Sequence, residues 1–394
     1  MIPRFKPSLG LPEIAAVLRK NQGAVQQFEK DFAQKFKAVD AVAFPYGRSA
    51  QWAFFKAMGI EKSEIIMPAY TCSVVAYAVT LSGNQPVFID IKKNNYNMDL
   101  EIAEAALSRN TRAIVATHTF GYPQDLTHLK AIVKKGEKKY GKKIWLIQDC
   151  CHAFGAKWKG QMIGTSGDVA IYALNISKII TSIFGGMLTF QNKALANKVR
   201  LWRDSQYNQA TWIKELYRRL YIISACAAFN DKMYSLTNFF EKNTFFLNRI
   251  TKSYHLDKKI AFPPDFLEKM SDVEAAIGIK QLDRYEKIIL KRKKTALFYD
   301  KYIKRPPDWN FPMLLNGATY SHYVIQVPNR DCIVKKYASK GLDVGTLINY
   351  SIPSLPEYQH MRNVYCPNAE EISRKTINLP LLANEIKVLK ILNN

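Results

Sequence analysis

The sequence predicts an α/β fold with a mainly parallel seven-stranded sheet, followed by a smaller α+β region. Seven short runs between residues 40 and 190 are apolar almost throughout, as strands buried on both faces of a parallel sheet are. Helical patterns separate these runs, and this alternation is typical of α/β proteins. With 394 residues, 48% of them hydrophobic, the chain is long enough to form two domains.

The expected strands lie in the first half of the chain. They are Ala41–Phe44, Glu64–Met67, Pro86–Ile89, Ala113–Thr117, Ile144–Gln148, Val169–Leu174 and Met187–Phe190. The helix-like stretches between them include 50–58, 100–107 and 126–135. After residue 272, a helix-like run over 273–302 leads to a shorter strand, Tyr323–Val327. We therefore expect a large domain over 1–203, an aromatic insert or linker over 204–264 and a small C-terminal domain over 265–394.

Charge and cysteine content narrow the classes of function. The chain has 57 Lys and Arg against 33 Asp and Glu, which leaves a formal net charge of +24. Nucleic acid, an anionic membrane surface and a basic surface around a site for diphosphate substrates are three interpretations of this charge. No nucleic-acid-binding motif accompanies it, so we do not expect nucleic acid as a partner.

Localisation is expected to be cytoplasmic. The six cysteines show no zinc-ligand spacing, and reduced thiols fit the cytoplasm. Cys150 and Cys151 are interpreted as small buried hydrophobic residues. The first 20 residues contain no continuous apolar run of a secretory signal, and no run is long enough to span a bilayer.

An acid and a lysine follow two of the expected strands. Asp149 comes directly after the run 144–148, and Lys178 stands 29 positions later, after the run 169–174. Side chains at the carboxyl ends of such strands meet where ligands bind. Enzymes that use pyridoxal 5'-phosphate (PLP) need this pair, a carboxylate for the pyridine nitrogen and a lysine that bonds to the cofactor. Two charges at the edge of a buried region explain the pair equally well at this point.

Around this pair the sequence resembles the DegT/DnrJ/EryC1/StrS family of PLP-dependent sugar aminotransferases. The matching segments run over nearly the whole chain, in the order of the family. They are Pro68-Ala69-Tyr70-Thr71, Pro86-Val87-Phe88-Ile89-Asp90, His118–Pro123, Gln148–Ala156, Gly160–Gly164 with Gly167-Asp168, Ala173–Lys178 with Gly185-Gly186, Met270–Leu282 and Asn378-Leu379-Pro380.

The resemblance implies a transferase of PLP fold type I that works as a homodimer. It implies that Lys178 and Asp149 are catalytic, and that an amino group moves from a donor, expected to be glutamate, to a nucleotide-linked keto-sugar for surface polysaccharide. The residues that it implies for cofactor binding are Gly47, Arg48, Ser49, Cys72, Asp149, His152, Ser177 and Lys178. From the residues alone, Gly47 after a strand has two interpretations: it marks only a turn, or its neighbouring backbone amides hold a phosphate.

Three departures from the family pattern concern the cofactor. The family's serine five residues before the lysine is Ala173 here, and its frequent aromatic residue after P-a-x-T is Cys72. The segment 265–270 lacks the usual glycine and asparagine of G-y-N-y-R-M. Arg48, Tyr70 or Ser177 is expected to compensate.

The segment 204–264 is longer and more aromatic than the family pattern predicts. Within 213–230, apolar residues recur at helical spacing, with basic residues off that face. Two interpretations stay open: such a helix packs on its own protein or a partner subunit, or it makes peripheral contact with the inner face of a membrane.

Two alternatives to an aminotransferase also stay open. A PLP-dependent sugar dehydratase is a sibling chemistry, but in the known branch a histidine replaces the lysine, and Lys178 argues against it. The other is a regulatory or binding protein that has kept the fold and lost efficient cofactor binding, which Ala173 and Cys72 favour.

Overall fold

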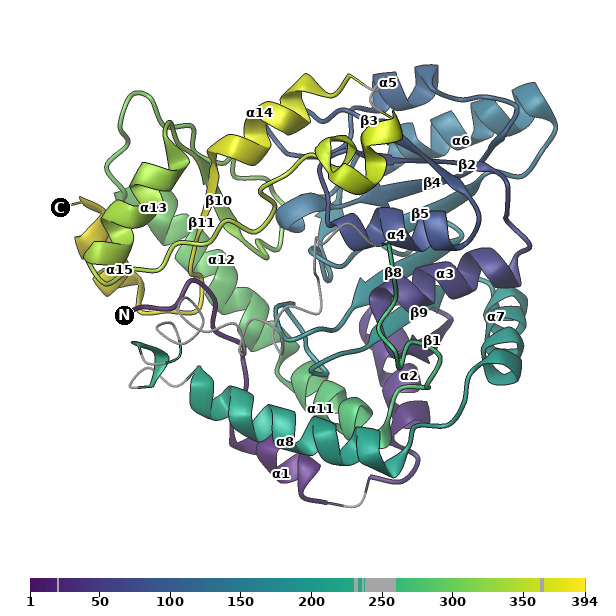
Figure 1. Ribbon diagram of the computed structural model, residues 1–394, viewed down its shortest axis with the longest axis horizontal. Coiled ribbons are helices and arrows are strands. Elements are labelled where there is room, and N and C mark those ends of the chain that lie inside the picture. The colour runs from purple at the N-terminus through teal and green to yellow at the C-terminus, as the bar shows by residue number, and fades with distance from the viewer. Residues whose placement is uncertain (20, 230–232, 236, 238–259, 362–364, 394) are drawn as a thin grey trace.

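The computed structural model describes residues 1–19, 21–229, 233–235, 237, 260–361 and 365–393. Its centre is a seven-stranded sheet in the order β1-β9-β8-β5-β4-β2-β3 (Figure 1). The strands are β1 (Asp40–Phe44), β2 (Glu64–Pro68), β3 (Gln85–Ile89), β4 (Thr111–Thr117), β5 (Trp145–Asp149), β8 (Val169–Ala173) and β9 (Gly186–Phe190). Each lies within a residue or two of an expected strand, so the prediction of this sheet is confirmed.

The sheet is parallel except at one strand. β2–β3, β2–β4, β4–β5 and β5–β8 pair in parallel, whereas β9 runs antiparallel to both β8 and β1. Because the carboxyl ends of parallel strands share one edge, the residues after β4, β5 and β8 lie beside one another.

Helices cover both faces of the sheet, because successive strand residues point to opposite sides. Val42 and Phe44 join a core cluster beneath α3 (Gly47–Ala57), α4 (Ser73–Leu81) and α7 (Lys193–Gln206). Ala41 and Ala43 join a second cluster beneath α2 (Ala24–Lys35), α5 (Leu100–Ala105) and α6 (Leu126–Tyr140). The alternation explains why the strands are apolar throughout rather than at every second residue.

The C-terminal part is built on a two-stranded antiparallel sheet, β10 (Tyr323–Gln326) with β11 (Thr376–Leu379). The run expected as one helix over 273–302 is two helices, α11 (Asp272–Asp283) and α12 (Tyr285–Tyr302), which meet at Arg284. Besides α8, which is described next, the other elements among the described residues are α1 (Leu11–Val17), η1 (Thr119–Gly121), β6 (Lys157–Trp158), β7 (Gln161–Met162), α13 (Arg330–Ser339), η2 (Ile352–Ser354), η3 (Pro356–Met361), α14 (Pro367–Lys375) and α15 (Glu385–Asn393).

The segment expected as an insert contains one described long helix, α8 (Trp212–Ala228), which lies beside α1 and α11 at the lower edge of Figure 1. Much of the rest of the segment lies outside the described residues. The division at 203 and 264 stays a prediction. Among the described residues, no helix is both long and apolar enough to cross a bilayer.

Candidate active site

Asp149 is held by hydrogen bonds at the carboxyl end of β5. The register pairs it with Thr117, the last residue of β4. The Thr117 hydroxyl donates to Asp149 Oδ2 at 3.1 Å, and the Cys151 N–H donates to Oδ1 at 3.0 Å. The carboxylate is buried yet lines a pocket. These two donors fix the direction in which the carboxylate points.

Lys178 lies on the turn that follows β8. Its N–H donates to the Asn175 carbonyl at 3.0 Å, and the Ser177 hydroxyl donates to Asn175 Oδ1 at 2.7 Å. The end of the loop is fixed as well, since Leu174 and Gly185 are joined by a backbone hydrogen bond of 2.9 Å. Gly185 has φ +112°, a conformation that a side chain strongly disfavours. The Gly-Gly turn after the lysine therefore anchors the loop that carries it.

The N-terminus of α3 forms another wall. A Cβ at Gly47 would lie 2.7 Å from the Ala173 Cβ, so only a glycine lets this backbone approach β8 so closely. Ser49 is fully buried, and its hydroxyl donates to the Tyr46 carbonyl at 2.9 Å. Ser49 thus closes the turn before the helix. The N–H groups of a first helical turn have no acceptor within their own helix, and together with the helix dipole they form a site that favours an anion.

One pocket brings most of the expected residues together. It encloses about 500 Å³ between its atoms, open solvent at its mouth included. Six expected residues line it: Gly47, Arg48, Cys72, Asp149, His152 and Lys178. Ser49 and Ser177 are absent from its lining, because their hydroxyls bond to the neighbouring turns.

Several residues that line the pocket were not predicted from the sequence. They are Gln51, Thr71, Val74, Val75, Thr117, Cys151, Ile171 and Asn175. Thr117 carried a usable signal, since it ends the expected strand next to the one that Asp149 follows. Cys150 is buried as expected, but Cys151 is half-buried and faces the pocket, and its Sγ accepts a hydrogen bond from the Ala173 N–H at 3.0 Å.

His152 is held as a neutral ring in the pocket wall. It stacks on Phe120, with ring centroids 6.0 Å apart and planes 7° apart. The Phe120 N–H donates to Nδ1 at 3.5 Å, so the neutral ring carries its proton on Nε2. Burial, with the positive charge of Lys178 and the nearby His322, holds the pKa of His152 well below its ordinary value.

His322 is a further residue near the site that the sequence gave no reason to select. It comes from the C-terminal part, just before β10, and its ring centroid lies 5.7 Å from that of His152. Burial lowers the pKa of His322 to about 3, with smaller contributions from Arg292 and Lys178. The ring is therefore neutral at physiological pH.

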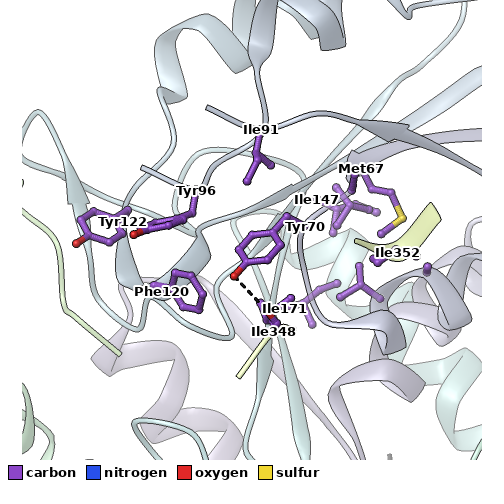
Figure 2. Close-up of a cluster of buried hydrophobic side chains, with 14 of the residues drawn as sticks. Met67, Tyr70, Ile91, Tyr96, Phe120, Tyr122, Ile147, Ile171, Ile348 and Ile352 are labelled. Atoms are coloured by element: carbon purple, nitrogen blue, oxygen red, sulfur yellow. Dashed lines mark hydrogen bonds between the residues drawn. The ribbon is translucent and has the colours of Figure 1, made fainter. Parts of the chain in front are cut away.

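Arg48 and Tyr70 were both expected to compensate for the side chains missing at Ala173 and Cys72, and the structure places them differently. Tyr70 points into the core, where its hydroxyl donates to the Ile348 carbonyl at 3.1 Å, so its expected role at the pocket is wrong (Figure 2). Arg48 does line the pocket.

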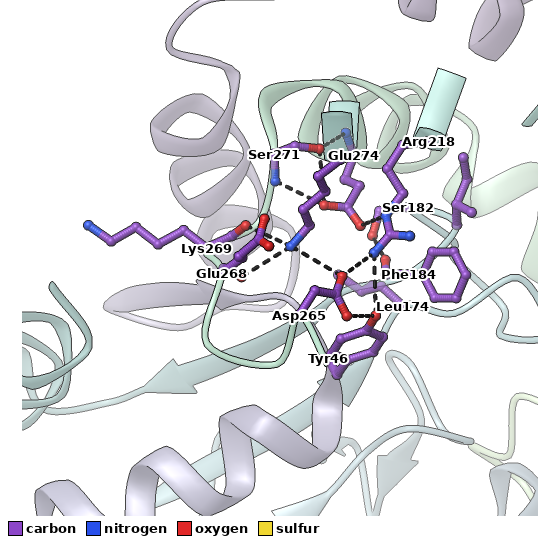
Figure 3. Close-up of polar contacts among 12 residues, drawn as sticks. Tyr46, Leu174, Ser182, Phe184, Arg218, Asp265, Glu268, Lys269, Ser271 and Glu274 are labelled. Atoms are coloured by element: carbon purple, nitrogen blue, oxygen red, sulfur yellow. Dashed lines mark hydrogen bonds and ion pairs between the residues drawn. The ribbon is translucent and has the colours of Figure 1, made fainter. Parts of the chain in front are cut away.

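A buried ion-pair network supports the turn before α3 (Figure 3). Tyr46, the residue before Gly47, donates its hydroxyl hydrogen bond to Asp265 at 2.6 Å. Arg218 of α8 donates to the same carboxylate at 2.8 Å and to Glu274 of α11 at 2.9 Å. Asp265, in the segment 265–270 that departs from the family pattern, therefore links α8 and α11 to the turn before α3.

These residues fit PLP. A carboxylate fixed by Thr117 suits a protonated pyridine nitrogen, and a lysine shares the pocket with it. The N-terminus of α3, where Gly47 leaves no side chain in the way and Arg48 adds a cation, suits a phosphate.

Comparison with known proteins agrees with this site. The model of the DegT/DnrJ/EryC1/StrS aminotransferase family matches residues 13–385. The chain belongs to this family. Its members are PLP-dependent, so the protein is a PLP-dependent aminotransferase of the sugar aminotransferase family.

Individual relatives are distant, but they cover all or nearly all of the chain. The spore coat polysaccharide biosynthesis protein SpsC of Bacillus subtilis is 26% identical over 399 residues, which cover 96% of this chain and 92% of that protein. The sugar aminotransferase CalS13 of Micromonospora echinospora shares the fold with a TM-score of 0.78 at 19% identity, over 100% and 99% of the two chains. Spr1654 of Streptococcus pneumoniae, described as a sugar aminotransferase in its PMP form, gives 0.77 at 20% identity, over 100% and 98%. The expected fold type I is thereby confirmed.

Proposed function

We propose that this aminotransferase moves an amino group from glutamate to a nucleotide-linked keto-sugar used for surface polysaccharide. The observation that carries the proposal is the single pocket in which Lys178, Asp149 and the N-terminus of α3 meet. SpsC is named for polysaccharide biosynthesis, which supports the product class. The net charge of +24 supports an anionic substrate such as a nucleoside diphosphate sugar.

Lys178 is proposed as the residue that moves the proton. When bound, PLP supplies an aldehyde that carries the amino group and a ring that accepts electrons from the substrate carbon. The amine of Lys178 takes the proton from the carbon that bears the amino group of the donor, and it returns a proton to the keto carbon of the sugar in the reverse half. Its turn is fixed at both ends, so the amine works from a defined position.

Asp149 is proposed to keep a proton on the pyridine nitrogen, with Thr117 and the Cys151 N–H holding its carboxylate in place. His152 is proposed as a neutral donor at the ring oxygen of the cofactor, since its proton is on Nε2. Arg48 and the N–H groups after Tyr46 are proposed to bind the phosphate.

The two alternatives fit the site less well. A dehydratase of the known branch would have a histidine where Lys178 stands. A protein that had lost its cofactor would have no reason to keep a buried carboxylate with two donors beside a lysine, because a buried charge costs free energy.

Assembly and location are also proposals. We infer a homodimer, as in other fold type I enzymes, and a cytoplasmic protein. The six thiols support the location, since all six cysteines are free.

The visible absorption spectrum tests the function directly. We expect PLP-incubated protein to show a visible band that L-glutamate bleaches, and a nucleotide-linked keto-sugar then to restore it. Bleaching without recovery over a panel of keto-sugars would reject the substrate class and keep the donor half-reaction. Absence of a band at saturating PLP would reject the enzyme and favour the binding protein.

A further inference from the structure

The Arg48 cation in the pocket wall packs on the ring of Tyr46. Arg48 is buried and lines the pocket, and its guanidinium carbon lies over the Tyr46 ring, 5.6 Å from the ring centroid. A cation is attracted to the face of an aromatic ring, and the attraction is larger where water is excluded. A stacked guanidinium also loses fewer rotamers when it binds an anion. The Tyr46 ring therefore limits the Arg48 guanidinium to one position at the pocket.

The Tyr46 ring is itself fixed at its hydroxyl end. The hydroxyl donates to Asp265 Oδ1 at 2.6 Å and accepts a hydrogen bond from Arg218 at 3.3 Å (Figure 3). Burial raises the pKa of Tyr46 above its ordinary range, so the hydroxyl keeps the proton that it donates. Asp265 is in turn held by Arg218 at 2.8 Å and by Lys214 at 3.6 Å. The ring therefore cannot turn away from Arg48 without breaking a hydrogen bond to a charged group.

The edge of the same ring contacts the loop that carries Lys178. The ring of Phe184, in that loop, lies 5.9 Å from the Tyr46 ring between centroids, with planes 73° apart, which is an edge-to-face contact. The Arg218 guanidinium covers the Phe184 ring at 4.1 Å from its centroid. The backbone of Tyr46 also forms a β-bridge with Gly185 at the end of the loop. Tyr46 thus connects the N-terminus of α3 with the loop of the lysine.

Asp265 stands where the family pattern G-y-N-y-R-M has its glycine. A glycine has no side chain, so it could not accept the hydrogen bond from the Tyr46 hydroxyl. The chain also has Ala173 where the family has a serine, so a hydroxyl is missing from the pocket. One departure from the pattern removes a polar group from the pocket, and the other adds a carboxylate behind the ring on which Arg48 packs. The two departures therefore complement each other.

We propose that Tyr46 and Asp265 are positioning residues for the phosphate of the cofactor. Asp265 fixes the Tyr46 ring, the ring fixes the Arg48 guanidinium, and Arg48 supplies part of the binding that Ala173 lacks. The lining of the pocket includes Arg48 but neither Tyr46 nor Asp265, so both act through Arg48. The inference rests on the proposed contact between Arg48 and the phosphate, and it does not depend on which sugar is the substrate.

The first test compares PLP with pyridoxal, which has the same ring and aldehyde but no phosphate. Tyr46→Leu should raise the Kd for PLP about tenfold and change the Kd for pyridoxal by less than about twofold, because only the phosphate needs Arg48. Titrations followed by the visible band measure both constants without turnover. Equal rises for the two ligands would indicate a general loss of structure and would overturn the inference, as would an unchanged Kd for PLP.

The second test asks whether Tyr46 acts through Arg48. Arg48→Gln alone should raise the Kd for PLP. In that background, Tyr46→Leu should change the Kd by less than about twofold, because the side chain that the ring positions is no longer a cation. If the effects of the two substitutions instead multiply, Tyr46 acts by another route and the inference is wrong.

The third test isolates the Tyr46 hydroxyl. Tyr46→Phe keeps the ring and should raise the Kd for PLP about threefold. Asp265→Ala should have the same effect, and the double variant should be no worse than either, because both substitutions break one bond. Tyr299→Phe is the matched control, since its buried hydroxyl donates to the Pro380 carbonyl at 2.7 Å in the C-terminal part and should leave the Kd unchanged. Multiplying effects of Tyr46→Phe and Asp265→Ala would overturn the role of Asp265.

Two controls separate this inference from the proposed function. Far-UV circular dichroism establishes that each variant is folded, and Tyr46→Phe carries the test if Tyr46→Leu is not. A wild-type protein without a visible band at saturating PLP would reject the proposed function itself. A wild-type band together with variants that bind PLP as tightly as the wild type would reject only the positioning roles of Tyr46 and Asp265.

Discussion

Thr117 donates a hydrogen bond to the carboxylate of Asp149 across the adjacent ends of β4 and β5, at 3.1 Å. The bond joins two residues that are 32 positions apart in the chain. It exists because parallel strands in register bring their last residues side by side. Thr117 thereby becomes a positioning residue for the proposed acid of the reaction.

The first prediction concerns this pair. Thr117→Val should lower kcat about tenfold, since the carboxylate keeps one donor but loses its direction. Asp149→Asn should cost orders of magnitude more, because an amide cannot hold the proton on the pyridine nitrogen. Thr117→Ser, which keeps the hydroxyl, should recover most of the rate. Steady-state kinetics with L-glutamate measure all three, and a serine variant as slow as the valine variant would contradict the positioning role.

The second prediction concerns Lys178. Lys178→Ala should abolish turnover and the visible band of the bound cofactor. The thermal unfolding midpoint should stay near that of the wild type, because the Lys178 side chain makes no hydrogen bond or ion pair among the described residues. Lys178→Arg serves as the control that keeps the charge. Substantial turnover in the alanine variant would remove Lys178 from the mechanism.

The third prediction concerns cofactor affinity. Ala173→Ser restores the hydroxyl that the family carries five residues before its lysine, in a side chain that lines the pocket beside Gly47. A hydrogen bond to a charged group contributes about 1.5 kcal/mol, so the Kd for PLP should fall roughly tenfold. Ala173→Val, which adds bulk without a hydroxyl, should raise it. Fluorescence titration with PLP measures the Kd of each variant. A higher Kd in the serine variant would mean that Gly47 leaves no room for the added hydroxyl.

The fourth prediction concerns the ion-pair network that supports the turn before α3. Arg218→Met leaves the fully buried carboxylate of Glu274 without its cation and should reduce the free energy of unfolding by about 3 kcal/mol. The half-buried Asp265 loses Arg218 as well but keeps Lys214 at 3.6 Å. Lys198→Met, at an exposed position of α7, should change it by less than about 0.5 kcal/mol. Urea denaturation measures both. Equal effects of the two substitutions would show that the network contributes little.

The fifth prediction is an acid sensitivity due to His118. Its Nδ1 accepts from the Gln124 N–H at 2.9 Å, and Nε2 lies 3.2 Å from the Gln148 side-chain oxygen, so the neutral ring satisfies both partners. Burial lowers the pKa of His118 to about 4, against roughly 6.5 in the unfolded chain. The unfolded state therefore binds a proton first as pH falls.

The neutral ring of His118 contributes fully to the free energy of unfolding above pH 6.5. This contribution is lost as pH falls toward 4, and the loss is roughly 2 kcal/mol at pH 5. His118→Asn should reduce the difference between urea midpoints at pH 7 and pH 5. The exposed histidine variant His360→Asn is the control. A difference unaffected by His118→Asn would contradict the assignment.

The local sequence pattern alone determined the central sheet of this protein and the sheet edge at which its site lies. Strands buried on both faces must be apolar throughout, so the seven strands could be read along the chain, and the acid and lysine that follow two of them could be placed at one sheet edge. The fold type and the cofactor came from the family resemblance.

Contacts between distant segments decided the rest. His322 reaches the site only because the C-terminal part packs against η1 and the loop after β5, and no local signal encodes that. Ser49 and Ser177 had the right residue type, but their hydroxyls bond to the neighbouring backbone and to Asn175.

Helix α8 shows most clearly why the sequence alone could not predict which side of a helix is buried. Its periodicity showed an apolar stripe but not the direction in which that stripe points. The direction is set by Asp265 and Glu274, which lie 47 and 56 residues beyond Arg218 and draw the basic side of the helix inward. A sequence pattern divides a helix into two faces, whereas only the tertiary structure determines which of them is covered.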